Sequence, residues 1–318
     1  MSEKRTIAIM GATGAQGGGL ARAILRDRSG PFRVRAITRD PDSAKARALA
    51  ELGAEVVRAD IADEESLKRA FSGAYGAFLV SFFWHHTDAE RDLGEIRNMA
   101  KAARSAEVRH AIYSTLEDTR DYVSLDDERM PTVDGKYKSP HMDVKGEADR
   151  FFTELGVPTT FLLTTFYWEN FFNPGTGPTR VGDQLLLTFP MADKILAGIA
   201  TEDIGKAALG IFKKEQQYIG QKVGISGDHL TGKQYAAALS TALGKNISYQ
   251  PPTHDEFRAL NLPFGIETAN SFQFMCDFNE EFVRARSLAF SRSVNPELQS
   301  FPQWLEANKH LVYDPDAR

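Results

Sequence analysis

The stretch TIAIMGATGAQGGGLAR, residues 6–22, decides the fold, because a short apolar run leads into a loop with five glycines in nine positions. Ordering glycine costs backbone entropy, so something must lie close against this loop. Gly11, Gly14 and Gly17 form a GxxGxxG pattern between a predicted strand and a predicted amphipathic helix. In that context the loop N–H groups and the helix N-terminus can hold a pyrophosphate. The sequence therefore predicts a dinucleotide-binding loop, made of Gly11, Thr13, Gly14, Ala15, Gln16 and Gly17.

Two periodicities alternate through the first half of the chain. Short apolar runs typical of strands lie at 6–10, 33–38, 54–59, 76–81, 110–115 and 158–163. Helix-like segments lie between them at 18–27, 43–52, 64–73, 88–106 and 141–155. Continuous apolar strands that alternate with amphipathic helices indicate a parallel sheet covered on both faces. We therefore expect an α/β fold of the Rossmann type, with a doubly wound parallel sheet.

The pattern changes near residue 166, where aromatic residues, prolines and glycines crowd together. Further helices are predicted at 201–214, 231–245 and 302–311. We expect a Rossmann domain over 1–165, with the helix 201–214 packing on it. The remainder, 166–318, is expected to form a smaller α/β domain on the substrate or partner side.

Composition excludes several classes of protein. The chain has 318 residues and a formal net charge of −5, and it contains no basic run, which argues against direct nucleic-acid binding. The lone Cys276 cannot form an internal disulfide. No apolar stretch approaches the ~20 residues that span a bilayer, and no signal peptide precedes the first strand. The sequence predicts a cytoplasmic protein with no membrane contact.

The end of the second predicted strand indicates which dinucleotide is bound. NAD-specific sites usually carry an acidic residue there, whereas this strand ends in Thr38 and Arg39. A guanidinium at that place pairs with a 2′-phosphate, and Lys45 can add a second charge. Asp60, followed by Ile61, suits a contact with the adenine amino group, or Asp60 caps the next helix. The predicted cofactor is NADP(H).

The whole chain resembles the NmrA-like family of atypical short-chain dehydrogenase/reductases, most closely its animal and fungal NADPH-sensing members. The resemblance rests on GATGAQGG, TRDP, HMDVKGEADRFF, LGVP, FYWENFF, ATEDIG and PQWLEANK. It implies that Lys145 contacts the nicotinamide ribose. It also implies that four residues lie beside the nicotinamide end of the cofactor: Tyr167, Trp168, Glu169 and Asn170. A second group is implied to lie under the cofactor: Ser81, Phe82 and Phe83.

Candidate catalytic residues follow from the Tyr-x-x-x-Lys pattern of classical short-chain reductases. Lys145 is in place, but His141 stands where the tyrosine would be. His141 either moves a proton or packs at a helix start. Ser114 either polarises a carbonyl group or is a hydroxyl at a strand end. His85 and His86 adjoin Asp88, but adjacent residues rarely converge on one ion, so no metal site is predicted.

Two functions remain open at the level of sequence. The favoured one is an NADPH sensor that regulates a protein partner, with a homodimer also conceivable. The polar segment 116–139 is then a movable element, or else a passive surface loop. The alternative is an NADPH-dependent reductase of a small carbonyl, quinone or enone, which uses Lys145 in place of a Tyr-Lys pair.

Overall fold

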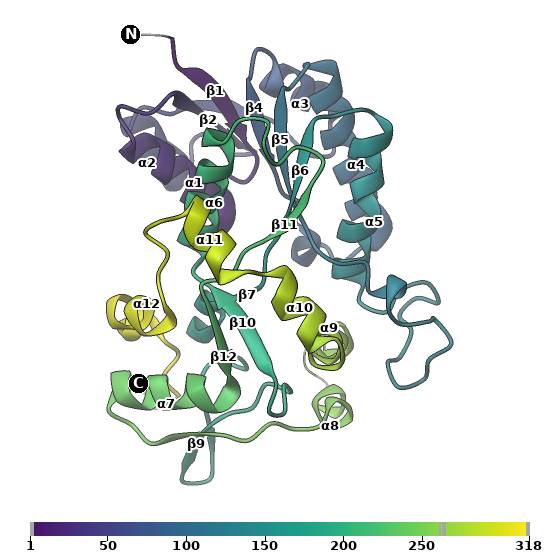
Figure 1. Cartoon of the computed structure of the whole chain (residues 1–318), viewed down its shortest axis with the longest axis vertical. Coiled ribbons are helices and arrows are strands. Elements are labelled where there is room, and N and C mark those ends of the chain that lie inside the picture. The colour runs from purple at the N-terminus through teal and green to yellow at the C-terminus, as the bar shows by residue number, and fades with distance from the viewer. Residues whose placement is uncertain (1–2, 261, 263–264, 316–318) are drawn as a thin grey trace.

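The computed structural model describes residues 3–260, 262 and 265–315. Its centre is a seven-stranded sheet in the order β11-β6-β5-β4-β1-β2-β3, and every neighbouring pair is parallel (Figure 1). The strands are β1 (Arg5–Ile9), β2 (Phe32–Thr38), β3 (Glu55–Arg58), β4 (Gly76–Leu79), β5 (His110–Thr115), β6 (Thr159–Leu163) and β11 (Lys222–Gly224). This is the predicted Rossmann-type α/β fold, which is confirmed.

The strand order reverses beside β1. From β1 the chain runs outward through β2 and β3, then returns to the other side of β1 and continues through β4, β5 and β6. Ligands of open α/β sheets bind at the carboxyl ends of the strands, in the crevice where the order reverses. The fold therefore directs attention to the loops that follow β1 and β4.

Helices cover both faces of the large sheet. Figure 1 shows α1, α2 and α6 on one side and α3, α4 and α5 on the other. Their bounds are α1 (Ala15–Arg26), α2 (Ala44–Glu51), α3 (Glu64–Phe71), α4 (Ala89–Ser105), α5 (Pro140–Glu154) and α6 (Thr201–Lys213). α6 packs along α1 although about 175 residues separate them along the chain. The second half of the chain thus returns to the Rossmann sheet.

One strand of the large sheet was missed from sequence. β11 pairs with β6 through Lys222, Val223 and Gly224. It has three residues, of which Lys222 is exposed and only Gly224 is buried. A strand this short and polar, at the edge of a sheet, lacks the apolar run that predicts a buried strand.

Two small sheets and the remaining helices form a second layer of structure below the large sheet in Figure 1. The sheets are β12-β10-β7 and β13-β9-β8. Their strands are β7 (Phe166–Tyr167), β8 (Thr179–Val181), β9 (Gln184–Leu187), β10 (Ile195–Ile199), β12 (Asp228–Thr231) and β13 (Ile247–Tyr249). The helices are α7 (Gly232–Leu243), α8 (His254–Ala259), α9 (Gly265–Asp277), α10 (Asn279–Ala285), α11 (Leu288–Val294) and α12 (Phe301–Asn308). Short 3₁₀ turns are η1 (Phe83–His85), η2 (Thr119–Asp121), η3 (Trp168–Phe172) and η4 (Lys309–Leu311).

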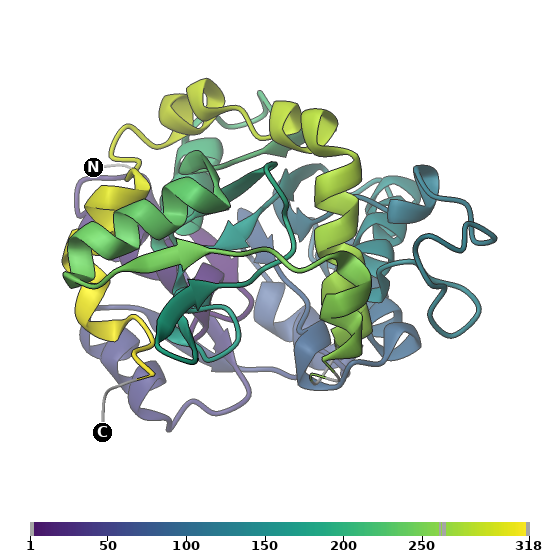
Figure 2. The same ribbon diagram turned by 90° about the horizontal axis from the view of Figure 1, so that it is seen from below.

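Each layer has its own core. The core of the large sheet consists mainly of aliphatic residues from its strands and covering helices, with several phenylalanines among them. The second layer packs on aromatic residues, among them Trp168, Phe171, Tyr235, Phe301 and Trp304. In Figure 2 the yellow-green helices α9 and α10 lie between the small sheets and the blue-green segment 116–139 at the edge of the molecule. These helices bring residues from the end of the chain to the crevice of the Rossmann sheet.

Candidate functional site

A cavity of about 620 Å³ opens at the point where the strand order reverses. Its walls come from the glycine loop, the ends of β4 and β5, the start of α5, the segment after β6, and α9. Phe82, Phe166, Phe272 and Met275 form apolar walls, and hydroxyl, amide and histidine side chains line much of the rest. Among the described residues that line it, Lys145 is the one Lys, Arg, Asp or Glu side chain. The cavity therefore suits a largely apolar, uncharged molecule beside the glycine loop.

The glycine loop lies at one end of this cavity. Gly11, Gly14, Ala15, Gln16 and Gly17 line it, whereas Thr13 belongs to the same loop outside the lining. α1 begins at Ala15, and its first turn contains no acidic side chain, so its positive end is open to an anion.

Crowding distinguishes two of these glycines. A Cβ atom at Gly17 would lie 2.5 Å from the carbonyl oxygen of Met10, so the fold itself requires glycine there. A Cβ atom at Gly14 would have one neighbour within 4 Å, the Gly11 carbonyl oxygen at 3.2 Å. The protein therefore leaves open space at Gly14, which is the place where backbone must approach a pyrophosphate.

Gln16 links the glycine loop to the second layer. Its Nε2 donates to the Tyr167 hydroxyl at 2.6 Å, and both residues line the cavity. Burial raises the pKa of Tyr167 above its ordinary value. The tyrosine therefore stays a neutral phenol that accepts from Gln16.

Lys145 begins a series of hydrogen-bonded, buried polar side chains that leads from the cavity into the protein. The Lys145 Nζ donates to the Ser81 Oγ at 2.7 Å, and the Ser81 Oγ donates to Asp92 Oδ2 at 2.9 Å. Asp92 is fully buried on α4, and Lys145 is 9% exposed on α5. Burial lowers the pKa of Lys145 and raises that of Asp92, while each charge partly offsets the shift of the other. Ser81 therefore separates a buried cation from a buried anion.

His86 extends this chain toward the surface. Its Nε2 lies 3.7 Å from Asp92 Oδ1 and 3.6 Å from Glu95 Oε2. The sequence analysis considered His86 only together with His85 and Asp88 and did not predict that it lies beside Asp92 and Glu95. The three side chains could hold a metal ion by spacing. However, the His86 Nδ1 accepts from the Asp88 N–H at 3.0 Å, so the neutral ring carries its hydrogen on Nε2. A hydrogen on Nε2 leaves that nitrogen without the lone pair that a metal ion needs, so the ring in this tautomer faces Asp92 and Glu95 without forming a metal site.

His141 lies at the start of α5, one turn before Lys145, and lines the same cavity. Its Nδ1 is 2.5 Å from Oε1 of Glu267 on α9, which sequence reasoning missed. The ring also packs on Trp84, with centroids 4.9 Å apart. Ser114 lines the cavity from the end of β5 and is buried. The structure thus brings the candidate residues His141, Lys145 and Ser114 to one cavity.

The predicted adenosine-binding residues follow the ends of β2 and β3, except Lys45, which lies in the first turn of α2. The side chains of Arg39 and Lys45 are exposed, and neither makes a hydrogen bond or ion pair among the described residues. Asp60 Oδ1 accepts from the Ala62 N–H, and Asp63 is the residue that caps α3. The residue that caps the helix after β3 is therefore Asp63 and not Asp60. Ile61 is buried directly after Asp60.

Some residues of the segment after β6 line the cavity, and others point into the protein core. Tyr167 and Asn170 line the cavity, as do Phe82 and Phe83 after β4 together with Ser81. Trp168 is instead fully buried in the aromatic core, where its Nε1 donates to the Tyr235 hydroxyl. Glu169 accepts from the N–H of Thr201 at the start of α6. Neither Trp168 nor Glu169 lines the cavity, and we leave both out of the proposed site.

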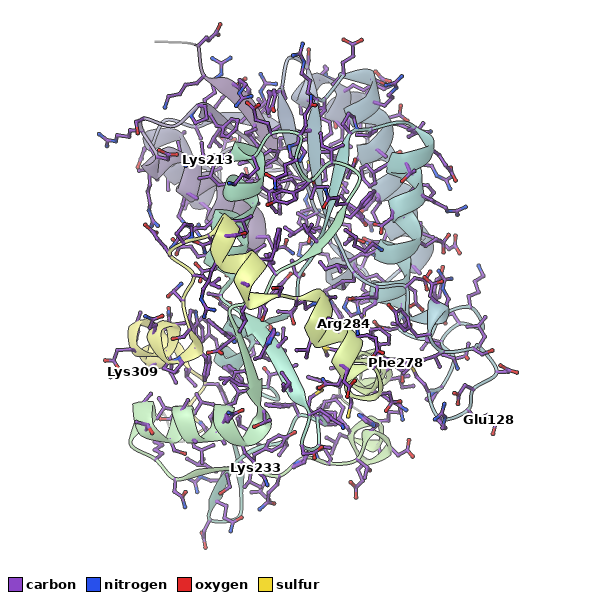
Figure 3. The ribbon with its side chains drawn as sticks, in the orientation of Figure 1. Glu128, Lys213, Lys233, Phe278, Arg284 and Lys309 are labelled. Carbon is purple, nitrogen blue, oxygen red and sulfur yellow. The ribbon has the colours of Figure 1, made fainter. Side chains whose placement is uncertain are left out.

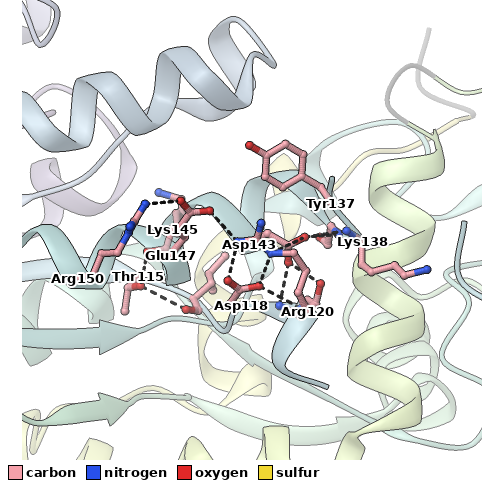
Figure 4. A network of polar contacts seen from close by, with 12 residues as sticks. Thr115, Asp118, Arg120, Tyr137, Lys138, Asp143, Lys145, Glu147 and Arg150 are labelled. Carbon is pink, nitrogen blue, oxygen red and sulfur yellow. Dashed lines mark hydrogen bonds and ion pairs between the residues drawn. The ribbon is translucent and has the colours of Figure 1, made fainter. Parts of the chain in front are cut away.

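Segment 116–139 is tied down at both ends by one carboxylate (Figure 4). Asp143 on α5 accepts from the N–H of Thr119 at 2.8 Å and from the N–H of Lys138 at 2.8 Å. The Lys138 Nζ donates to the carbonyl oxygens of Asp127 and Met130 within the segment. These bonds hold the base of the loop, so movement of this segment would be confined to its exposed tip. Figure 3 shows Glu128 at that tip, away from the body of the molecule.

Among the residues that the sequence analysis missed, Asp92 could have been identified from its neighbours in the sequence. It lies at helical spacing with Ile96, Met99 and Ala103 on the buried face of α4, where a carboxylate is unexpected. Glu267 had no such local signal, because 126 residues separate it from His141. In the part of the chain that is described, no helix is long and apolar enough to cross a membrane.

Comparison with known proteins agrees with this architecture. The NmrA-like family matches residues 3–306. The NmrA-like family domain-containing oxidoreductase lnbB of Aspergillus flavus is 30% identical over 275 residues, which cover 80% of this chain and 78% of that protein.

Solved structures share the fold. NmrA, a negative transcriptional regulator, in complex with NADP superposes with a TM-score of 0.74 at 20% identity, over 96% of this chain and 95% of that one. The triphenylmethane reductase of Citrobacter sp. complexed with NADP(H) gives 0.73 at 22% identity, over 95% and 99%. With its Rossmann sheet, its glycine loop and a match over nearly its whole length, the chain belongs to the NmrA-like family.

Proposed function

We propose that the protein binds NADP(H) and uses it to reduce an uncharged carbonyl, quinone or enone compound. The cavity carries this proposal, because it extends from the glycine loop past Lys145 to His141, Phe272 and Met275. Sequence alone favoured a sensor, but a sensor needs room for the cofactor only. An apolar volume beside the nicotinamide end of the site is what a reductase requires in addition.

The residues present fit NADP(H). Open space at Gly14 and the acid-free first turn of α1 suit the pyrophosphate. Arg39 and Lys45 are exposed cations that can receive a 2′-phosphate. Two solved relatives of the fold were determined with NADP or NADP(H), which supports the same choice.

When bound, the reduced nicotinamide supplies a hydride. Lys145 would hold the nicotinamide ribose by its ammonium group, which Asp92 balances through Ser81. Ser114 would donate its hydroxyl to the substrate oxygen from the end of β5. The aromatic walls exclude water from the reacting atoms. The oxidoreductase name of the Aspergillus flavus relative supports this class of reaction.

The test follows NADPH absorbance with a panel of quinones, aldehydes and enones, after calorimetric titration with NADPH, NADP⁺, NADH and NAD⁺. We expect NADPH to bind more tightly than NADH and at least one panel member to be reduced. Lys145→Met should abolish that turnover, while Glu128→Gln on the exposed loop tip should leave it unchanged. Tight binding of NADPH without oxidation by any panel member would contradict the reductase.

A second candidate is the NADPH sensor that acts on a protein partner, as a monomer or homodimer. It is supported by the solved relative NmrA, which is a negative transcriptional regulator found in complex with NADP. The absence of a tyrosine at position 141 also suits it. On this reading, binding of NADPH without turnover should change the affinity for the partner. The net charge of −5 favours protein contacts over direct binding to DNA.

A further inference from the structure

The contact between α9 and the start of α5 has a consequence for chemistry in the cavity. We propose that His141 and Glu267 form a catalytic dyad, in which His141 donates the proton that completes reduction of the substrate and Glu267 orients its ring. This inference rests on the proposed reductase function. It assigns the proton donor of that reaction and a positioning residue 126 residues away in the chain.

The hydrogen bonds around Glu267 show that Nδ1 of His141 is the nitrogen that donates to it. Glu267 Oε1 accepts from the Ser139 Oγ at 3.0 Å and from the His141 N–H at 3.1 Å. The His141 Nδ1 lies 2.5 Å from the same oxygen. Because Oε1 already accepts from two donors, it carries no hydrogen itself, so the hydrogen in the third contact lies on Nδ1.

The opposite edge of the ring is available to a substrate. His141 lines the cavity, and its side chain is 16% exposed. The Nε2 atom makes no hydrogen bond to any described residue, and it is not fully buried. Its unoccupied donor position therefore opens to the cavity. Trp84 packs against the ring at a centroid distance of 4.9 Å and limits its rotation.

Glu267 also has an electrostatic reason to hold this place. It lies at the amino end of α5, where a negative charge is stabilised by the helix dipole. The Glu267 carboxylate accepts from Nδ1, so Nδ1 keeps its hydrogen and Nε2 is the nitrogen left to exchange a proton. The ring can therefore deliver a proton from Nε2 and remain in position afterwards.

The carbonyl carbon of the substrate gains a hydride from the dihydronicotinamide, which is oxidised, and the carbonyl π bond breaks. The substrate oxygen takes the proton from Nε2 of His141, so that an O–H bond forms. The neutral ring regains a proton from solvent through the cavity. Lys145 is one helical turn away and remains the residue that holds the cofactor.

The substrate class follows from the walls of the cavity. An acid on Nε2 serves a substrate that gains negative charge on oxygen, which means an aldehyde, a ketone or an enone. The lining offers no acidic partner for a cationic substrate among the described residues. The dyad therefore suits an uncharged carbonyl compound.

The first experiment needs no cofactor. Nitrogen-15 NMR of the free protein at mildly alkaline pH reports which ring nitrogen of His141 carries hydrogen. We expect the Nδ1–H tautomer in the wild type and its loss in Glu267→Leu. The spectra of the other histidines serve as internal controls. An Nε2–H tautomer for His141 in the wild type would overturn the dyad.

The second experiment measures turnover of 4-nitrobenzaldehyde and 2-cyclohexen-1-one with NADPH. His141→Ala should lower kcat on the order of a hundredfold or more while the affinity for NADPH is unchanged. Added imidazole should restore part of the rate in His141→Ala but none in Lys145→Met. Glu267→Gln should also lower kcat, and the matched exchange Glu128→Gln should not.

The outcomes separate the two proposals. Turnover by the wild type that survives His141→Ala would overturn the dyad and leave the reductase standing. A loss in His141→Ala without rescue by imidazole, and with weaker NADPH binding, would show a structural role for the ring. No turnover of the quinones, aldehydes or enones by the wild type would overturn the reductase, and the dyad with it.

Discussion

The two ends of the proposed NADP(H) site are built in opposite ways. At the inner end, Lys145, Ser81 and Asp92 are buried and bonded to one another. At the outer end, Arg39 and Lys45 are exposed and unpaired among the described residues. The inner groups are held in place before any ligand arrives, whereas the outer cations must be ordered by the ligand. Substitutions at the inner end should therefore disturb stability as well as binding, and those at the outer end binding alone.

The largest expected effect comes from the inner end. Lys145→Met leaves Asp92 buried without its counter-charge, so the free energy of unfolding should fall by about 3 kcal/mol at mildly alkaline pH. Burial raises the pKa of Asp92 in the folded state, so the folded protein takes up a proton there more readily than the unfolded chain. The loss should therefore shrink as the pH falls.

Urea unfolding of the cofactor-free protein at mildly alkaline and mildly acidic pH measures this effect. The double variant Lys145→Met with Asp92→Asn is the control, because it removes both charges and should recover much of the loss. An equal loss at both pH values, or a double variant less stable than the single one, would contradict the buried charge pair.

A second effect separates binding from folding within the glycine loop. Gly14→Ala should weaken NADPH binding about a hundredfold, or by about 2.7 kcal/mol, because its Cβ fills the space reserved for the pyrophosphate. The free energy of unfolding should change by less than about 1 kcal/mol, since the added atom meets only the Gly11 carbonyl oxygen. Calorimetry and urea unfolding measure the two quantities.

Gly17→Ala is the matched comparison, because its Cβ would lie 2.5 Å from the Met10 carbonyl oxygen and must destabilise the fold. If Gly14→Ala destabilised the protein as much as Gly17→Ala, the open space at Gly14 would not be a ligand site.

The smallest effect belongs to the outer end. Arg39→Glu should weaken NADPH about tenfold more than NADH, or by about 1.4 kcal/mol, because it replaces a partner of the 2′-phosphate with a repelling charge. The difference should decrease with salt, since the side chain is exposed. Stability should be unaffected. Arg28→Glu, an exposed reversal after α1, is the control for net charge. Equal losses for both nucleotides would contradict the assignment of Arg39.

The same contrast explains what sequence could predict. The glycine loop and Arg39 depend on local rules, since each lies at the end of one strand, and the Rossmann strands other than β11 follow from their apolar runs. Glu267 meets His141 only because α9 returns to the start of α5, which no local pattern encodes. Trp168 matched a family segment beside the nicotinamide, but its side chain turns into the aromatic core. Such directions depend on tertiary packing.

Transfer of a hydride from NADPH to a carbonyl compound in the cavity is the step that distinguishes the proposed reductase from a sensor. The most direct measurement uses NADPH deuterated at C4 of the nicotinamide, with the quinone, aldehyde and enone panel, and analyses the products by mass spectrometry. We expect one deuterium in the product of at least one panel member, and none with the Lys145→Met variant. Absence of deuterium from every product, with stoichiometric protein and saturating deuterated cofactor, would contradict the reductase and favour the sensor.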